Sequence, residues 1–180
     1  MHELGALTGT LGVHKVDHIG VAVRSIETAC TLFVDVLGAT FVNGGDDPVL
    51  GIRTVQLRLP PGLRFELLQP ARDDCYLHGY LAKRGEGVHH ITILVGDIHR
   101  ALAALDDAGY EVVDTDVTSD PTWKQTYLRP RSGHGMLLQI VESDTDWDAP
   151  AEGVTLEGVV AGRYLWQGDV AVPREDAEDG

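Results

Sequence analysis

Residues 16–23, VDHIGVAV, return as VHHITILV at residues 88–95, and this internal repeat decides the fold. The histidines near the start of each copy, His18 and His90, are 72 residues apart. Each copy is rich in apolar and β-branched residues, which is typical of a strand with at least one buried face. A unit that occurs twice predicts two similar modules that share their architecture.

An amphipathic helix and further strands follow each copy. Ser25 and Asp97 are favourable helix N-caps, and Gly38 and Gly109 stand where the two helices are expected to end. Strands are then expected near residues 40–42, 52–59 and 63–68, and near residues 111–113, 126–128 and 136–141. Each half therefore has the order β-α-β-β-β, and the predicted fold class is α+β, with two paired βαβββ modules.

The repeat also suggests domain boundaries. An N-terminal segment, 1–13, precedes a first module at 14–72, and a linker with a short helix, 73–87, leads to a second module at 88–142. Residues 143–180 form a C-terminal extension with an acidic tail that is expected to be disordered, and residues 154–166 are expected to add one or two strands.

The composition limits the partners. The net charge of −14 argues against nucleic acid and anionic membranes. No secretory leader and no apolar run of about 18 residues is visible, so a cytoplasmic location is expected. Two cysteines, Cys30 and Cys75, do not make a disulfide framework.

Four polar residues occupy equivalent places in the two copies. Besides His18 and His90, Glu66 lies in the apolar stretch 65–68 and Gln139 in the matching stretch 138–141. If the modules pair, two imidazoles, a carboxylate and an amide oxygen can bind one divalent transition metal: Co, Mn, Zn, Ni or Fe. Taken singly, each histidine also fits a structural or exposed position, and a lone strand Glu fits a solvent-facing one.

Four further residues are candidates for contacts with a small-molecule substrate. His134, in the turn before Gln139, fits either a proton donor or an exposed turn residue. Lys124, Tyr127 and Arg129 lie along a predicted strand of the second module and could meet an anionic group. Surface charges and a core tyrosine explain the same three residues, since only alternate strand residues share a face.

The segments 17–23 (DHIGVAV), 65–70 (FELLQP) and 83–91 (KRGEGVHHI) resemble the methylmalonyl-CoA epimerases and their glyoxalase-like relatives in the vicinal oxygen chelate superfamily. The resemblance spans about residues 14–142. It implies paired βαβββ modules around a divalent metal, which neighbouring substrate oxygens chelate while carboxylate bases move protons. It also implies a homodimer.

Two departures from the epimerase pattern bear on the activity. In the epimerases two glutamates flank the substrate; Val49 falls where the first is expected, with Asp46 and Asp47 as nearby carboxylates, and Gln139 stands at the second. An amide cannot act as a base, which leaves Glu66. One base suffices for isomerisation, elimination, decarboxylation or a lyase step.

The sequence therefore favours a metal-dependent isomerase, epimerase-like enzyme or lyase acting on a small carbonyl or acyl-thioester substrate. Two alternatives stay open. Two His and one Glu also match the ligands of non-haem Fe(II) dioxygenases, which cleave aromatic rings. A non-catalytic protein that binds and sequesters a small molecule would use the same fold without a metal.

Overall fold

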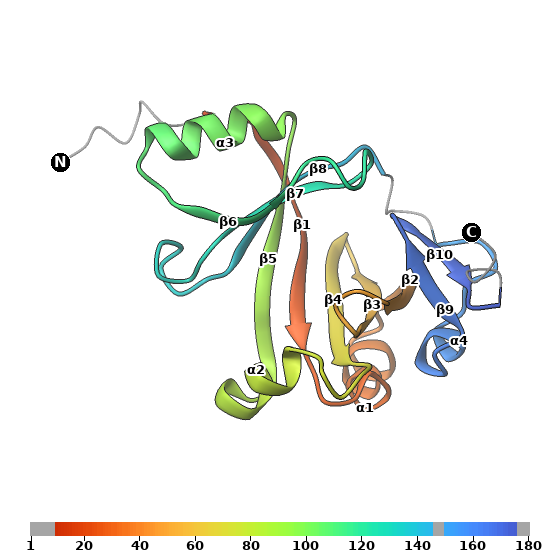
Figure 1. The fold of residues 1–180 in the computed structure, drawn as a ribbon. Coiled ribbons are helices and arrows are strands. Elements are labelled where there is room, and N and C mark those ends of the chain that lie inside the picture. The colour runs from red at the N-terminus through yellow and green to blue at the C-terminus, as the bar shows by residue number, and fades with distance from the viewer. Residues whose placement is uncertain (1–9, 146–149, 176–180) are drawn as a thin grey trace. The chain divides into compact units, whose positions relative to one another are not determined.

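The computed structural model describes residues 10–145 and 150–175. Figure 1 follows the chain through its helices and strands. In chain order these are β1 (Val13–Ala22), α1 (Ile26–Cys30), the π-helix η1 (Thr31–Val36), β2 (Thr40–Asp47), β3 (Ile52–Leu59), β4 (Leu63–Pro70), α2 (Leu77–Arg84), β5 (Gly87–Val95), α3 (Ile98–Asp107), β6 (Val112–Asp116), β7 (Lys124–Leu128), β8 (Leu138–Glu142), α4 (Leu156–Val160), β9 (Tyr164–Gln167) and β10 (Val170–Pro173).

The chain divides into two compact units. One comprises His18–His89 and Thr145–Gly180, and we call it the Glu66 unit; the other comprises Met1–Asp17 and His90–Asp144, and we call it the Gln139 unit. The division runs through β1 and through β5, so each of these strands is one continuous element whose residues belong to both units.

In the Glu66 unit the strand order is β10-β9-β2-β3-β4-β1. β1 is parallel to β4, while β2, β3 and β4 are antiparallel neighbours. The register sets Gly20 opposite Glu66. The C-terminal strands extend this sheet, because β9 pairs with β2 and β10 pairs with β9.

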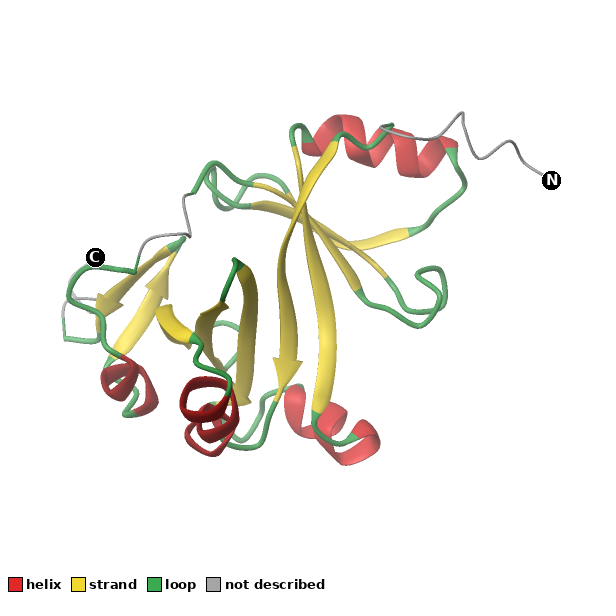
Figure 2. Cartoon of the chain, turned by 180° about the vertical axis from the view of Figure 1, so that it is seen from behind, coloured by secondary structure: helices red, strands yellow, loops and turns green. Residues whose placement is uncertain are grey.

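The Gln139 unit repeats this scheme with the strand order β5-β8-β7-β6. β5 is parallel to β8, and β8, β7 and β6 are antiparallel neighbours. Here the register sets Thr92 opposite Gln139. The predicted α+β fold of two βαβββ modules is therefore confirmed, and Figure 2 shows the mixture of strands and short helices.

Three clusters of buried apolar residues fix which face of each sheet is covered. In the Glu66 unit, α1, η1 and α4 cover the face that carries Leu57 and Leu67, and α2 packs on the opposite face around Leu68. In the Gln139 unit, α3 covers the face that carries Ile140. His18, Glu66, His90 and Gln139 lie on the faces that α1 and α3 leave open.

Two local features differ from the sequence prediction. The first helix begins at the predicted N-cap, with Ser25 accepting from the amide of Thr28, but it continues as the π-helix η1, in which Leu37 N–H donates to Leu32 C=O. The stretch 154–166, predicted as strand alone, contains α4, which is capped by Thr155 and packs its Val159 into the core. Short helices of this kind depend on tertiary packing more than on propensity.

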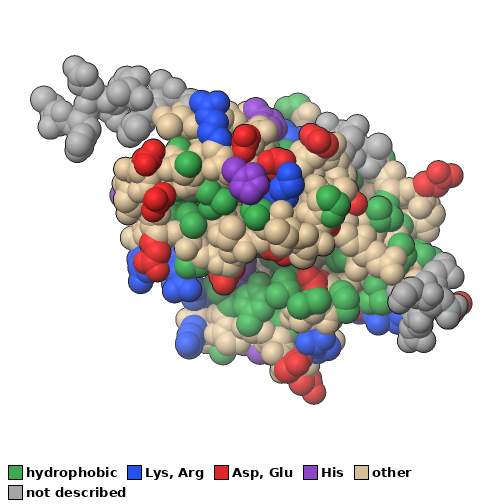
Figure 3. Space-filling model, turned by 45° about the horizontal axis from the view of Figure 1, so that its top comes forward, with side chains coloured by type: hydrophobic (Ala, Val, Ile, Leu, Met, Phe, Trp, Pro, Cys, Tyr) green, Lys and Arg blue, Asp and Glu red, His purple; other side chains and the backbone are tan. Residues whose placement is uncertain are grey.

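The surface agrees with the acidic composition. Figure 3 shows acidic side chains spread over the face it draws. No helix within residues 10–145 and 150–175 is long and apolar enough to cross a membrane. The cytoplasmic location stays a prediction. Residues 1–9 of the N-terminal segment and 176–180 of the predicted disordered tail lie outside the described residues.

Candidate metal centre

His18 on β1 and Glu66 on β4 come together on one face of the Glu66 unit. Side chains alternate along a strand, so His18 shares a face with Gly20, and Glu66 lies directly opposite Gly20 in the parallel pair. His18 is only 2% exposed. Its Nε2 lies 3.5 Å from Oε2 of Glu66.

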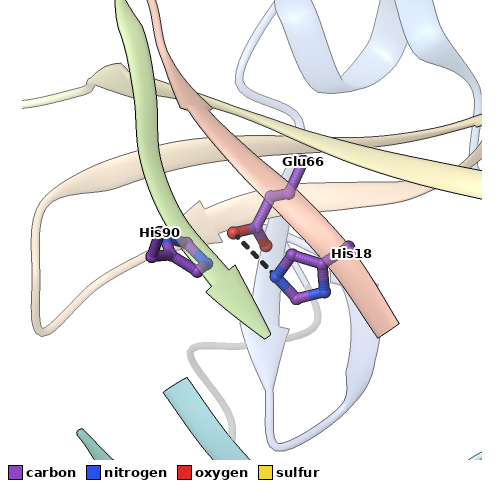
Figure 4. Close-up of side chains that lie close together, drawn as sticks. All are labelled: His18, Glu66 and His90. Carbon is purple, nitrogen blue, oxygen red and sulfur yellow. Dashed lines mark ion pairs between the residues drawn. The ribbon is translucent and has the colours of Figure 1, made fainter. Parts of the chain in front are cut away.

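His90 on β5 occupies the repeat-equivalent place of His18, two residues before Thr92. One ligand atom from each of His18, Glu66 and His90 lies within 4.8 Å of the others. Figure 4 draws the three side chains and the ion pair between His18 and Glu66. These three residues form a group of possible metal ligands.

The donor set fits a divalent metal. The 3.5 Å separation of His18 Nε2 and Glu66 Oε2 is longer than a good hydrogen bond. Two ligand atoms bound to one metal at about 2.1 Å each lie about 3–3.4 Å apart, which is close to this separation. Two imidazoles and a carboxylate suit first-row transition metals.

The charge of Glu66 acts on two ring side chains of the same unit, His89 and Tyr76. The His89 ring contacts Tyr76 at a centroid distance of 5.9 Å and Tyr80 at 4.8 Å. Burial lowers the pKa of His89, and the charge of Glu66 only partly opposes this. Burial, with the charge of Glu66 next in importance, raises the pKa of Tyr76. At neutral pH the imidazole of His89 is therefore neutral and the Tyr76 hydroxyl keeps its proton.

Gln139 lies in a hydrogen-bonded network of the Gln139 unit. Its Oε1 accepts from the Thr92 hydroxyl at 2.6 Å, and its Nε2 donates to Gln125 Oε1 at 2.7 Å and to the Tyr127 hydroxyl oxygen at 2.9 Å. The indole N–H of Trp123, which can only donate, also donates to Gln125 Oε1 at 3.0 Å. The indole therefore fixes which atom of Gln125 is oxygen, and Gln125 in turn fixes the amide of Gln139.

The other candidates from the second module lie in different places. Lys124 is on β7 but on the face of Ile140, where its Nζ lies 2.5 Å from Glu142 Oε1, so it does not share a face with Gln139. Tyr127 lies on the same face as Gln139, because its hydroxyl oxygen accepts from Gln139 Nε2. Arg129 is exposed just after β7, and His134 is exposed in the turn before β8 with a φ of 53°.

The carboxylates near Val49 do not provide a second base beside Glu66. Asp46 accepts from Arg53 at 2.6 Å and from Arg174 at 2.7 Å, and its position on β2 puts it on the face opposite Glu66. Asp47 Oδ1 accepts from the backbone amides of Val49 and Leu50 and so caps the β2–β3 turn. Val49 itself is 82% exposed.

Several site neighbours were missed from the sequence. Gln56 donates to Glu66, and the charge of Glu66 acts on Tyr76 and His89. Gln56 and Tyr76 belong to no motif, whereas His89 lies in the segment 83–91 but was not expected to act at the site. Gln125 had a weak signal: it alternates with Tyr127 on a predicted strand, which places the two on one face.

A family model described as the Glyoxalase/Bleomycin resistance protein/Dioxygenase superfamily matches residues 17–127. The chain belongs to this superfamily. The match includes three of the four repeat-equivalent residues, His18, Glu66 and His90.

Similar proteins of this superfamily include several epimerases. The mitochondrial methylmalonyl-CoA epimerase of Dictyostelium discoideum is 28% identical over 142 residues, which is 78% of this chain and 85% of the relative. The crystal structure of methylmalonyl-CoA epimerase from Mycobacterium tuberculosis has a TM-score of 0.67 and 25% identity, covering 80% of this chain and 95% of that one. A variant of the Streptomyces coelicolor epimerase, in complex with 2-nitronate-propionyl-CoA, has a TM-score of 0.64 and 28% identity, covering 74% and 99%.

Proposed function

We propose that this chain is a metal-dependent isomerase or lyase that moves a proton at the carbon beside the carbonyl of an acyl-CoA thioester. The observation that carries the proposal is the carboxylate of Glu66, held beside His18 on a buried sheet face. The substrate class is supported by the relatives, which are named as methylmalonyl-CoA epimerases or solved with an acyl-CoA analogue.

His18, Glu66 and His90 would hold one divalent ion: Co, Mn, Zn, Ni or Fe. When bound, the ion supplies positive charge beside the thioester carbonyl and a neighbouring substrate oxygen, which makes the adjacent proton easier to remove. Gln139 is the candidate fourth ligand, because its Oε1 keeps one lone pair beyond the bond from Thr92.

Glu66, the carboxylate of the His18–Glu66–His90 cluster, is the proposed proton-transfer group, acting in exchange with the metal; the alternative is that it serves only as a ligand. Tyr76 keeps its hydroxyl proton and can donate a hydrogen bond to a substrate oxygen. Asp46 is tied to two arginines and Gln139 is an amide, so neither offers a second base. Proton transfer on one face of the substrate is the expected consequence.

Arg129 is the cation proposed to meet an anionic part of the substrate, because Lys124 is already paired with Glu142. His134 is exposed, which favours its interpretation as a residue of the turn before β8 over its interpretation as a proton donor. By resemblance to the family we also expect a homodimer, which sedimentation velocity would test.

The proposal is tested by proton exchange in D2O. Metal-loaded protein is incubated separately with each configuration of methylmalonyl-CoA, and α-deuterium and configuration are followed by mass spectrometry and chiral analysis. One base predicts deuterium incorporation with retained configuration, because the proton leaves and returns on one face. Incorporation with loss of configuration would instead reveal two bases and an epimerase.

The matched variants are Glu66→Gln and Glu111→Gln. Glu66→Gln should abolish exchange, whereas Glu111→Gln, an exposed carboxylate paired with Arg131, should leave the exchange rate unchanged. Absence of exchange in the metal-loaded wild type with either configuration would overturn the proposed substrate class.

A second function is favoured by the same ligand set. Two His and one carboxylate are also the ligands of non-haem Fe(II) oxygenases. Oxygen consumption by the Fe(II)-loaded protein with a catechol would support ring cleavage. A wild type that takes up none of the five metals would favour a non-catalytic binding protein.

A further inference from the structure

Gln56 is a buried amide on β3 that pairs in register with Glu66 on β4. Its Nε2 donates a hydrogen bond of 2.9 Å to Oε1 of Glu66. The side chain is 6% exposed and lies between Val55 and Leu57, which face the opposite, apolar side of the sheet. Gln56 is thus a polar residue on the face of the candidate metal centre.

The orientation of the Gln56 amide is set by Glu66. Turning the amide over would bring its oxygen against a carboxylate oxygen, and two acceptors cannot bond to one another. The nitrogen therefore faces Glu66. The carbonyl oxygen, Oε1, is buried and has no hydrogen-bond partner within residues 10–145 and 150–175.

A buried carbonyl without a partner lowers stability, so fold stability does not account for an amide at this position. An apolar side chain of the same length would fill the space without that cost. The remaining role of the side chain is its bond to Glu66.

The two oxygens of Glu66 have different neighbours. Oε1 accepts from Gln56, and Oε2 lies 3.5 Å from His18 Nε2. A hydrogen bond to one oxygen restricts rotation of the carboxylate and leaves the other oxygen directed at the histidine. Hydrogen-bond partners of ligand carboxylates commonly contribute to metal affinity in this way.

We propose that Gln56 is a positioning residue that holds Oε1 of Glu66 and thereby reserves Oε2 as the metal ligand. The inference rests on the metal site of the proposed function, but not on its substrate or reaction. It concerns residues of the Glu66 unit alone.

The test compares Gln56→Met with Thr54→Val. Methionine keeps the length of the side chain without the donor. Thr54 lies two residues away on the same face of β3 and accepts from the Trp166 indole N–H at 2.8 Å, so its replacement removes a buried hydrogen bond that does not involve Glu66. Cobalt(II) binding to the full chain is measured by competition with a chelating dye, and thermal unfolding is measured without metal.

Gln56→Met should weaken cobalt(II) binding by about 10–100-fold, while its thermal midpoint without metal stays equal to or above that of the wild type. Its cobalt absorption spectrum should change, because Oε1 of Glu66 loses the hydrogen bond from Gln56 that restricts rotation of the carboxylate. Thr54→Val should show the reverse: a lower thermal midpoint and unchanged cobalt affinity.

Wild-type cobalt affinity and spectrum in Gln56→Met would overturn the inference. So would a loss of affinity that runs parallel to a loss of thermal stability, since that pattern indicates a structural role. A wild type that binds no cobalt would remove the metal site itself. Failure of the D2O exchange with intact cobalt binding would affect only the proposed reaction.

Discussion

The Thr92 hydroxyl donates a 2.6 Å hydrogen bond to Oε1 of Gln139, so the amide oxygen faces β5 and the nitrogen faces β7. The nitrogen side is fixed by Gln125, whose oxygen is itself fixed by the Trp123 indole. The direction of the hydrogen bonds through Gln125 and Gln139 therefore depends on the Trp123 indole N–H, which can only donate.

Replacing Gln139 with Glu should destabilise the protein by about 1–3 kcal/mol, because a carboxylate oxygen then meets Gln125 Oε1 without a proton between them. The double variant Gln139→Glu/Trp123→Phe should recover part of this loss, since Gln125 is then free to turn its NH2 toward the carboxylate. Urea unfolding of the two single variants and the double variant measures the coupling. If the double variant lost as much unfolding free energy as the two single variants together, the proposed hydrogen-bond network would be contradicted.

Asp46 is predicted to be structural. Asp46→Ala should lower the free energy of unfolding by about 3 kcal/mol, because it leaves the guanidinium of Arg53 without its buried partner. Cobalt(II) affinity should not change. Asp73→Ala, at an exposed position, is the control and should be close to neutral in both measurements. If Asp46→Ala lost metal affinity at unchanged stability, Asp46 would have to be assigned to the metal site and not to a structural role.

The Lys124–Glu142 pair should give stability a defined pH dependence. The hydrogen bond from Lys124, and then that from the amide of Ile98, lower the pKa of Glu142 below 4.5. A carboxyl whose pKa is lower in the folded state stabilises the fold above its unfolded pKa and loses that contribution as the pH falls through its folded pKa.

The comparison is between wild type and Glu142→Gln. The wild type should be the more stable at pH 7, and the difference should shrink as the pH falls below about 4.5. Chemical unfolding at several pH values between neutral and acid measures it. A difference that is constant with pH would show that the charge of Glu142 contributes nothing.

His134 is predicted to serve the turn before β8 and not catalysis. Its φ of 53° is unfavourable for a side chain with a Cβ, so His134→Gly should raise stability by about 0.5–1 kcal/mol. Gly135→Ala, whose φ is 94°, should have the opposite effect. In the D2O assay His134→Gly should exchange at the wild-type rate; a large loss would identify His134 as a proton donor.

The sequence by itself determined the repeat, and with it the fold class. Strand periodicity, N-caps such as Ser25 and Asp97, and the 72-residue echo are local features, so they are visible before the chain is folded. The same repeat gave His18 its equivalent in His90 and Glu66 its equivalent in Gln139, because equivalent residues of a repeated unit have equivalent backbones.

Tertiary structure decided how those side chains are used. Whether Asp46 faces Glu66 or two arginines depends on strand register and on the C-terminal extension that supplies Arg174. Whether Lys124 is available depends on Glu142 across the strand pair. Gln56 has no motif, since its role arises from pairing with Glu66. Partners distant in sequence, brought together by register and packing, set these assignments, and no local pattern encodes them.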